Sequence, residues 1–158
     1  MSGTLSAQVE PYAAAIDEMV PLYVSHWHEI ALDQERREAQ LAPRFQQYDV
    51  RDAAGEIVLV TLRDGGRLCG YFLCFVGYGL HYGLCMTAQM DVLYVHPSVR
   101  GRFGGLRLIR TMQKELRRRG VHRLFAGEKI GRSSGLGRLY EICGMRPIET
   151  YYSIWLGR

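Results

Sequence analysis

A predicted strand in this chain passes through a proline into a glycine-rich turn and then into a helix, an order that few folds share. Residues 90–96 are largely apolar, Pro97 ends that run, and residues 106–118 place apolar and basic side chains on opposite sides at helical spacing. The turn contains, in order, Arg100, Gly101, Arg102, Phe103, Gly104 and Gly105. The first amides of a helix lack intrahelical partners, the helix dipole favours negative charge there, and glycines admit a phosphate close to the backbone. The arrangement predicts an anion site; an ordinary loop before a surface helix is the alternative interpretation.

Two common phosphate-binding turns do not fit this spacing. A P-loop ends in Gly-Lys-Ser/Thr, and no lysine or hydroxyl side chain follows the glycines here. A dinucleotide-binding turn has the pattern G-x-G-x-x-G, whereas these glycines stand at positions 101, 104 and 105. A different kind of phosphate ligand is therefore expected.

Residues 95–97 and Arg100 resemble the acetyl-coenzyme A turn of the GNAT superfamily of N-acetyltransferases, written Q/R-x-x-G-x-G/A after a strand ending in V-x-P. Gly101 and Gly105 match that turn, whereas Phe103 stands where the family has its middle glycine. The resemblance implies acetyl-CoA as cofactor, with its pantetheine arm along β-strand backbone and its diphosphate on the amides of the turn. The cofactor-binding residues that it implies are Leu93, Tyr94, Val95, Arg100, Gly101, Arg102, Phe103, Gly104, Gly105 and Leu106.

A second motif of the same family follows downstream. Leu139, Tyr140, Glu141 and Gly144 match the pattern L-Y-E-x-x-G-F of the closing helix and strand. Gly144 stands where a helix end needs a left-handed residue, and Ser133 or Ser134 can cap the other end. The resemblance covers about residues 57–157. Within it, residues 81–91, 147–149 and 152–155 are similar to GNAT proteins encoded by bacteriophages.

A chain of 158 residues is long enough for one domain with a substantial core, so we expect a single acyl-CoA N-acyltransferase-like domain over residues 1–158. The first predicted elements are a strand at 6–10, a helix from Pro11 that Pro21 kinks or divides, and a helix at 43–48. Strands at 57–62 and 68–76, joined by a hairpin turn at 64–66, and the strand ending at His96 follow. The long helix, a strand at 123–129, a helix and a final strand complete the order. This order predicts an α+β fold, a three-layer sandwich with helices on both faces of a mixed, mostly antiparallel sheet. The resemblance adds that the central strands beside the phosphate helix splay apart.

Composition and charge narrow the function further. The chain has no uncharged apolar run of the roughly 18 residues that span a membrane and no basic start followed by an apolar segment, so we expect a cytoplasmic protein, in the host cytoplasm if a phage encodes it. The four cysteines form no C-x-x-C pair, which predicts reduced core cysteines and no metal site. Residues 1–99 carry 6 basic and 12 acidic side chains, whereas residues 100–158 carry 14 and 4. This positive field would attract a polyphosphate ligand; a solvated helix face and nucleic-acid binding are the other interpretations.

Acetyl transfer from a thioester to an amine needs a neutral amine, a polarised carbonyl and a proton for the departing thiolate. The resemblance implies that a backbone amide of residues 93–95 polarises the thioester carbonyl and that Tyr140 protonates the departing thiolate. The alternative interpretation of Tyr140 is a packing residue on the apolar stripe of its helix. We choose Asp91 as the base because strict alternation would place it on the same face as Leu93 and Val95. The alternatives are Gln89, Glu128, Glu29 and an ordered water.

The acceptor side is less constrained. The residues that we expect there are His28, Glu29, His81 and Gln89, because the first helix commonly forms the acceptor wall in this family and the long loop carries His81. His26 and His28 cannot both face one metal ion at their spacing on a helix. The asparagine that many relatives carry before the last helix is missing, since residues 132–134 read Arg-Ser-Ser. Tyr151, Tyr152 and Trp155 on the final strand are expected to pack or to form a subunit interface.

The predicted function is acetyl-CoA-dependent N-acetylation of a primary amine by direct transfer. The acceptor stays open among a small amine, a host protein and a modified base. One alternative is a non-catalytic protein of this fold that binds nucleic acid or a host protein through its basic helix. Another is a related transferase that uses a longer acyl group or aminoacyl-tRNA. A homodimer is a possible assembly.

Overall fold

The computed structural model describes residues 3–132 and 135–157. The elements in chain order are β1 (Leu5–Val9), α1 (Tyr12–Ile30), the short 3-10 helix η1 (Arg37–Ala39), α2 (Phe45–Ala53), β2 (Ile57–Asp64), β3 (Arg67–Tyr78), β4 (Met86–Val95), the 3-10 helix η2 (Pro97–Val99), α3 (Gly104–Arg118), β5 (Arg123–Phe125) and α4 (Leu136–Ile142). No described helix combines the length and apolar character that crossing a bilayer requires.

The strands form one sheet in the order β1-β2-β3-β4-β5. β1 to β4 are antiparallel neighbours, whereas β5 runs parallel to β4. The β2–β3 turn has positive φ at both Gly65 (57°) and Gly66 (90°), the backbone that a two-residue hairpin requires. The predicted hairpin at residues 64–66 is thereby confirmed, as is the mostly antiparallel α+β arrangement.

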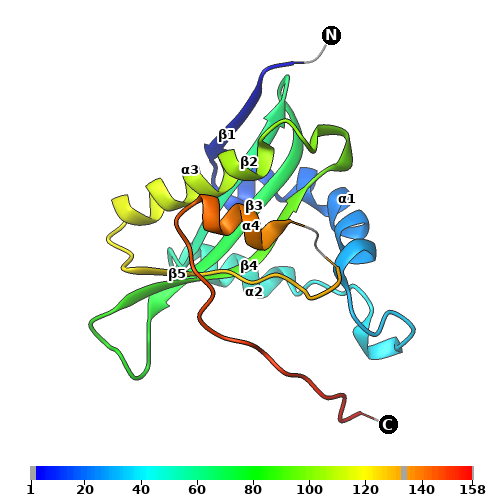
Figure 1. Ribbon diagram of the computed structural model, residues 1–158, viewed down its shortest axis with the longest axis vertical. Coiled ribbons are helices and arrows are strands. Elements are labelled where there is room, and N and C mark those ends of the chain that lie inside the picture. Colours follow the sequence, from blue (N-terminus) through cyan, green and yellow to red (C-terminus); the bar gives the residue numbers. More distant parts are fainter. Residues whose placement is uncertain (1–2, 133–134, 158) are drawn as a thin grey trace.

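Helices cover both faces of this sheet (Figure 1). α3 and α4 pack on one face over a mainly aliphatic core that includes Val60, Leu62 and Leu108. α1 packs on the other face, beside α2, over an aromatic core in which Tyr12, Tyr71 and Tyr94 are buried. The four cysteines are unpaired, and Cys69 and Cys74 are buried, as predicted for reduced core thiols.

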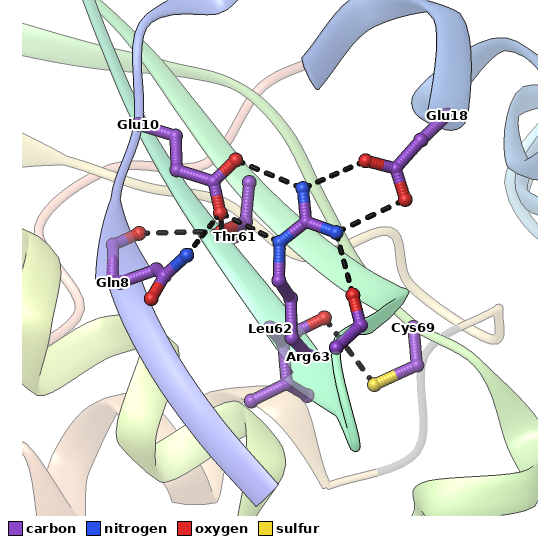
Figure 2. Close-up of polar contacts among 8 residues, drawn as sticks. Gln8, Glu10, Glu18, Thr61, Leu62, Arg63 and Cys69 are labelled. Atoms are coloured by element: carbon purple, nitrogen blue, oxygen red, sulfur yellow. Dashed lines mark hydrogen bonds and ion pairs between the residues drawn. The ribbon is translucent and has the colours of Figure 1, made fainter. Parts of the chain in front are cut away.

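A cluster of charged groups ties the β1 edge of the sheet to α1 (Figure 2). Arg63 on β2 donates two hydrogen bonds to Glu10, at 2.7 and 2.9 Å, and two to Glu18 on α1, at 2.8 and 3.0 Å. Thr61 donates a further bond to Glu10. The Arg63 hydrogen bonds lower the pKa of Glu10 to about 2, although burial opposes them. We call Glu10, Glu18, Thr61 and Arg63 the β1 clasp.

Three sequence predictions of secondary structure need correction. α1 is one helix from Tyr12 to Ile30 with the exposed Pro21 inside it, so of the two alternatives, a kink or two short helices, the second is wrong. The strand expected at 123–129 ends at Phe125. The final strand expected over residues 151–155 does not form. After α4 the chain runs away from the sheet to the C-terminal end (Figure 1), and residues 146–157 pair with no strand.

Candidate active site

The candidate site begins where β4 and β5 part. The two strands share three residue pairs, Thr87–Arg123, Ala88–Leu124 and Gln89–Phe125. β4 then continues to Val95, whereas β5 ends. Among the described residues, no strand pairs with this edge of β4 beyond Gln89. The predicted splay of the central strands is therefore confirmed, and it leaves backbone groups of β4 open to a ligand.

A β-bulge at Asp91 corrects the predicted direction of that side chain. Leu73 of β3 pairs with Val92 and Cys74 pairs with Met90, so Asp91 is an extra residue without an opposite partner. Strict alternation fails at this point. Leu93 and Val95 pack toward α3 and α4, whereas Asp91 contacts α2 on the other face. The expectation that Asp91 shares a face with Leu93 and Val95 is wrong.

Asp91 lies in a partly buried aromatic setting. The Tyr48 hydroxyl of α2 donates a hydrogen bond of 2.7 Å to its Oδ2, and Tyr48 in turn stacks on Tyr12, with ring centroids 5.5 Å apart. Burial raises the pKa of Asp91, and the hydrogen bond from Tyr48 and the charge of Arg51 offset this only in part. A carboxylate with a raised pKa is a better proton acceptor than an ordinary aspartate.

Tyr140 of α4 lies on the opposite side of β4. Its hydroxyl donates a 3.0 Å hydrogen bond to the Gly127 carbonyl and lies 3.4 Å from the Met90 sulfur. Burial raises its pKa further above the usual tyrosine value, so the phenol keeps its proton. Because Met90 and Asp91 are consecutive, the two candidate proton-transfer groups reach the divergence of β4 and β5 from opposite faces of the sheet.

The glycine-rich turn leads directly into α3. Gly101 has φ 82°, and Phe103, at the N-cap of α3, is left-handed with φ 61°. A non-glycine residue is strained in this region, which explains why a glycine is expected at position 103. The Phe103 side chain is 72% exposed, so it does not pack into the fold. Gly104 is needed for close packing instead, since a Cβ there would lie 2.7 Å from Leu62 Cδ2.

The two arginines of the turn already have partners. Arg100 donates two bonds to the Glu29 carboxylate, at 2.6 and 2.8 Å, and one of 2.9 Å to the Val95 carbonyl. Arg102 binds Asp64 in the β2–β3 turn, with its shortest distance 2.7 Å, and also the Gly3 carbonyl. Arg100 thus links the turn to α1, and Arg102 links it to the end of β2 and to the segment before β1.

The predicted acceptor residues are not gathered in one place. Glu29 on α1 contacts Arg100 of the turn. Gln89 lies at the last β4–β5 pair, two residues before Asp91. His28 is exposed on α1. His81 lies in the β3–β4 loop, at the other end of β4 from the turn, and lines a cavity of about 390 Å³ with Cys85 and His122.

Two residues near the site were not predicted as functional from the sequence. His26 is buried, stacks on Tyr94 with ring centroids 5.0 Å apart, and lies 3.0 Å from the Tyr71 hydroxyl. Burial lowers its pKa to about 4, and the charges of Lys129 and Arg100 act in the same direction. Tyr48 is the second, and no local pattern marks it because its contact with Asp91 spans 43 positions.

Gly144 follows α4 with φ 79°, which confirms the left-handed residue expected there. The caps expected at Ser133 and Ser134 lie outside the described residues. Within residues 3–132 and 135–157, no group of three His, Cys, Asp or Glu side chains could hold a metal ion.

Comparisons with known proteins identify the family. A model of the acetyltransferase (GNAT) family matches residues 16–145. No curated protein matches the chain. Ribosomal-protein-alanine N-acetyltransferase from Brucella melitensis biovar Abortus 2308 is a similar solved structure, with 19% identity and a TM-score of 0.70 over 98% of this chain and 100% of that one.

Two more solved structures extend the likeness. Glucosamine-6-phosphate N-acetyltransferase from Arabidopsis thaliana has 11% identity and a TM-score of 0.71 over 98% of this chain and 99% of that one. A predicted acetyltransferase with acetyl-CoA from Clostridium acetobutylicum has 11% identity and a TM-score of 0.64 over 97% of each chain. At such identities the likeness establishes the fold.

Proposed function

Because the chain belongs to the acetyltransferase (GNAT) family, we propose that it moves an acetyl group from acetyl-CoA directly to a primary amine while both are bound. The observation that carries this proposal is the open edge of β4 from Met90 to Val95, which leads through η2 to the glycine-rich turn at the start of α3. An extended thioester arm and a diphosphate need these two features side by side.

The open edge of β4 fits the cofactor. Successive amides of a strand point to opposite edges, and the His96 amide donates to Cys69 on β3, so the Val95 amide faces the open side. In this proposal residues 93–95 hold the pantetheine arm, and the amides of Gly101 and of residues 103–106 hold the diphosphate, since the Arg102 amide already donates to the Val99 carbonyl. Acetyl-CoA supplies an activated acyl group, and a β4 amide stabilises the negative charge on its carbonyl oxygen. A phosphate would compete with Glu29 for Arg100.

Tyr140 and Asp91 divide the proton transfers in this proposal. Tyr140 keeps its proton because burial raises its pKa, so it can protonate the departing thiolate. Asp91 takes the proton from the amine, directly or through a water. Gln89, at the last β4–β5 pair, contacts the amine of the acceptor. Glu29 and His28 on α1, and His81 in the β3–β4 loop, lie apart from Gln89 and would contact the outer parts of a larger acceptor. The similar proteins of known structure are named for unlike acceptors, namely ribosomal-protein alanine, glucosamine-6-phosphate and aminoglycosides, so the proposal names no single acceptor.

Binding of acetyl-CoA tests the proposal directly. Isothermal titration should show one site on the full chain, and Gly105→Glu should abolish it, because a carboxylate repels the phosphates and a Cβ at this position would lie 2.7 Å from Leu139 Cδ2. Gly83→Glu is the matched control, since its Cβ would meet nothing within 4 Å. Circular dichroism checks that both variants fold. Absence of binding by the unmodified protein would remove the enzyme proposal.

The role of Asp91 has a separate test. A base works only when deprotonated, so kcat/KM should rise with pH through a pKa above that of an ordinary carboxyl group. Asp91→Asn should lower kcat/KM and remove this ascending limb. Glu128→Gln and Gln89→Glu provide comparisons at two of the other positions considered for the base. An unchanged pH profile in Asp91→Asn would assign the proton to another group or to water.

A second candidate function is supported by the exposed face of α3. Arg107, Arg110, Lys114 and Arg117 are exposed, and no ion pair among the described residues engages them. Such a stripe suits a nucleic-acid backbone. A non-catalytic binder of this kind would bind nucleic acid in a salt-dependent manner and would not bind acetyl-CoA. Location in the cytoplasm and kinship with phage-encoded members stay predictions of the sequence.

A further inference from the structure

A cavity of about 330 Å³ lies where β1 ends and α1 begins. The chain from Val9 to Tyr12, the start of β2 and the last turns of α2 and α3 surround it, and we call it the β1–α1 cavity. In the sheet, β2 and β3 separate β1 from β4, so the cavity lies away from the open edge of β4. Among the residues that line it, none takes part in the proposed acetyl transfer. The β1–α1 cavity is therefore a separate candidate site.

One wall of the β1–α1 cavity is apolar and belongs to the rigid part of the fold. Ile57 and Leu59 line it, and both are buried because they form part of the core beneath α1. Val9, Pro11 and Tyr12 extend this wall. A fixed apolar wall suits an aliphatic chain, because a ligand can bury its carbon atoms there without reorganising the protein.

Most charged groups at the rim of the β1–α1 cavity are already paired. Arg118 and Arg119 both donate hydrogen bonds of 2.8 Å to the Glu115 carboxylate. Arg63 holds Glu10 within the β1 clasp. The Glu115 group carries one net positive charge and the β1 clasp carries one net negative charge, so the two are neutral together. The attraction for a ligand must therefore come from the remaining polar groups.

Two polar groups that line the cavity have no partner in the described part of the chain. No hydrogen bond or ion pair engages the Asp52 carboxylate at the end of α2. The Tyr12 hydroxyl is buried and makes no hydrogen bond. Burial raises the pKa of Tyr12 to about 12, and the charges of Asp49, Asp52 and Asp91 act in the same direction, so the field at this hydroxyl is negative. A carboxylate and a hydroxyl can both accept hydrogen bonds from a cationic N–H group.

We propose that the β1–α1 cavity binds a small organic cation, an aliphatic chain that ends in a guanidinium or ammonium group. The cationic group lies against Asp52 and the Tyr12 hydroxyl, and the chain lies against Ile57 and Leu59. The Tyr12 ring stacks on Tyr48, whose hydroxyl binds Asp91. The bound cation is thus two side chains away from the proposed base and touches none of the reacting groups.

Methyl NMR spectra of the full chain test this site, with n-butylguanidinium chloride as the probe. The probe has N–H donors and an aliphatic chain but no primary amine that acetyl transfer could consume. The methyl signals of Val9, Ile57 and Leu59 should shift and saturate with a Kd on the order of 1 mM, as expected for a ligand of this size. n-Pentanol, which has an aliphatic chain without the charge, should bind more weakly. Equal binding of the two probes would contradict the proposal, as would shifts confined to Leu93 and Val95 at the open edge of β4.

Three variants assign the binding to the two unpartnered groups. Asp52→Asn should weaken binding of the probe by about tenfold, because a charge-assisted hydrogen bond becomes a neutral one. Asp49→Asn is the matched control on the same helix; Asp49 is exposed and does not line the cavity, so this variant should bind as the parent does. Binding that is unchanged in Asp52→Asn, or weakened equally in Asp49→Asn, would overturn the proposal.

Tyr12→Phe removes the hydroxyl and keeps the ring that stacks on Tyr48. It should weaken binding of the probe, and thermal denaturation should show no loss of stability, because the hydroxyl has no hydrogen bond to lose. A destabilised variant would show that this hydroxyl has a partner within the protein, which contradicts the proposal. None of these measurements involves acetyl-CoA, so their failure is distinct from failure of the proposed acetyl transfer.

Discussion

The two edges of the sheet differ in how firmly they are held. At the β1 edge, all five residues of β1 pair with β2, and the β1 clasp joins this edge to α1. Arg102 adds an ion pair from the glycine-rich turn to Asp64 on the same side. At the other edge, β5 pairs with β4 over only three residues, and the strands then separate. The closed edge anchors the turn, and the open edge leaves backbone groups free for a ligand.

The largest expected effect is a loss of stability when the β1 clasp is broken at the closed edge, the β1 edge. Arg63→Met removes the cation shared by Glu10 and Glu18 and leaves a carboxylate whose side chain is 13% exposed without its partner. We expect a loss of about 3 kcal/mol in the free energy of unfolding, with acetyl-CoA affinity of the folded fraction unchanged. Urea denaturation measures the loss. Arg138→Met, which breaks the exposed pair with Glu141, should cost below about 1 kcal/mol.

The next effect is confined to the open edge. Tyr140→Phe removes the proposed proton donor and should lower kcat by about 10- to 1000-fold, with acetyl-CoA affinity nearly unchanged. The fold should survive, because the ring still fills its buried site and only the bond to the Gly127 carbonyl is lost. Thiol release under steady-state conditions measures kcat, and thermal denaturation provides the control. An unchanged kcat would exclude Tyr140 as the donor.

Acid should weaken the closed edge and α3 through two carboxylates. Hydrogen bonds from arginines lower the pKa of Glu10 and of Glu115 to about 2, whereas an unfolded glutamate titrates near 4.5. Their stabilisation is complete above pH 4.5 and is lost as the pH falls toward 2, by up to about 3 kcal/mol each. His26 has a pKa lowered from 6.5 to about 4, so the unfolded chain takes up a proton there first, and the free energy of unfolding already begins to fall below pH 6.5.

Denaturation by urea at several pH values separates these contributions. Glu10→Gln should reduce the slope of the stability curve between pH 4.5 and 2, where Glu115 still titrates, and should leave the part between pH 6.5 and 4.5 as in the parent. A curve that keeps its full slope below pH 4.5 in this variant would show that the β1 clasp does not hold Glu10 ionised.

The smallest expected effect lies in the turn between the two edges. Phe103→Gly relieves the left-handed backbone and also removes the ring, whereas Phe103→Ala removes the ring alone. The glycine variant should therefore be more stable than the alanine variant by about 1 kcal/mol. Thermal denaturation measures this difference. Titration with acetyl-CoA shows whether the ring hinders the cofactor, since both variants would then bind more tightly than the parent.

Local patterns predicted much of the fold. The strand, turn and helix around Pro97 and the hairpin at residues 64–66 were predictable because their signals lie within a few residues. The face of the sheet on which the Asp91 side chain lies was not predictable, because the bulge depends on how β3 pairs with β4. The partners of Arg100 and Arg102 lie 71 and 38 positions away, so no local pattern reveals them. The final strand was expected from the resemblance to the family's closing helix and strand, but a strand also needs a neighbouring strand, and none pairs with residues 146–157.

The extra residue in β4 can be separated from the packing around it. Cys74 pairs with Met90 and Leu73 pairs with Val92, so deletion of Asp91 would make these two pairs consecutive. Leu93 and Val95 would keep their places under α3, and Tyr94 would keep its stack on His26. The strand would lose only the carboxyl group that Tyr48 binds. A single inserted amino acid thereby adds a titratable group to a core strand and leaves both layers of the core in register, so the chemistry of this position can change without a change of fold.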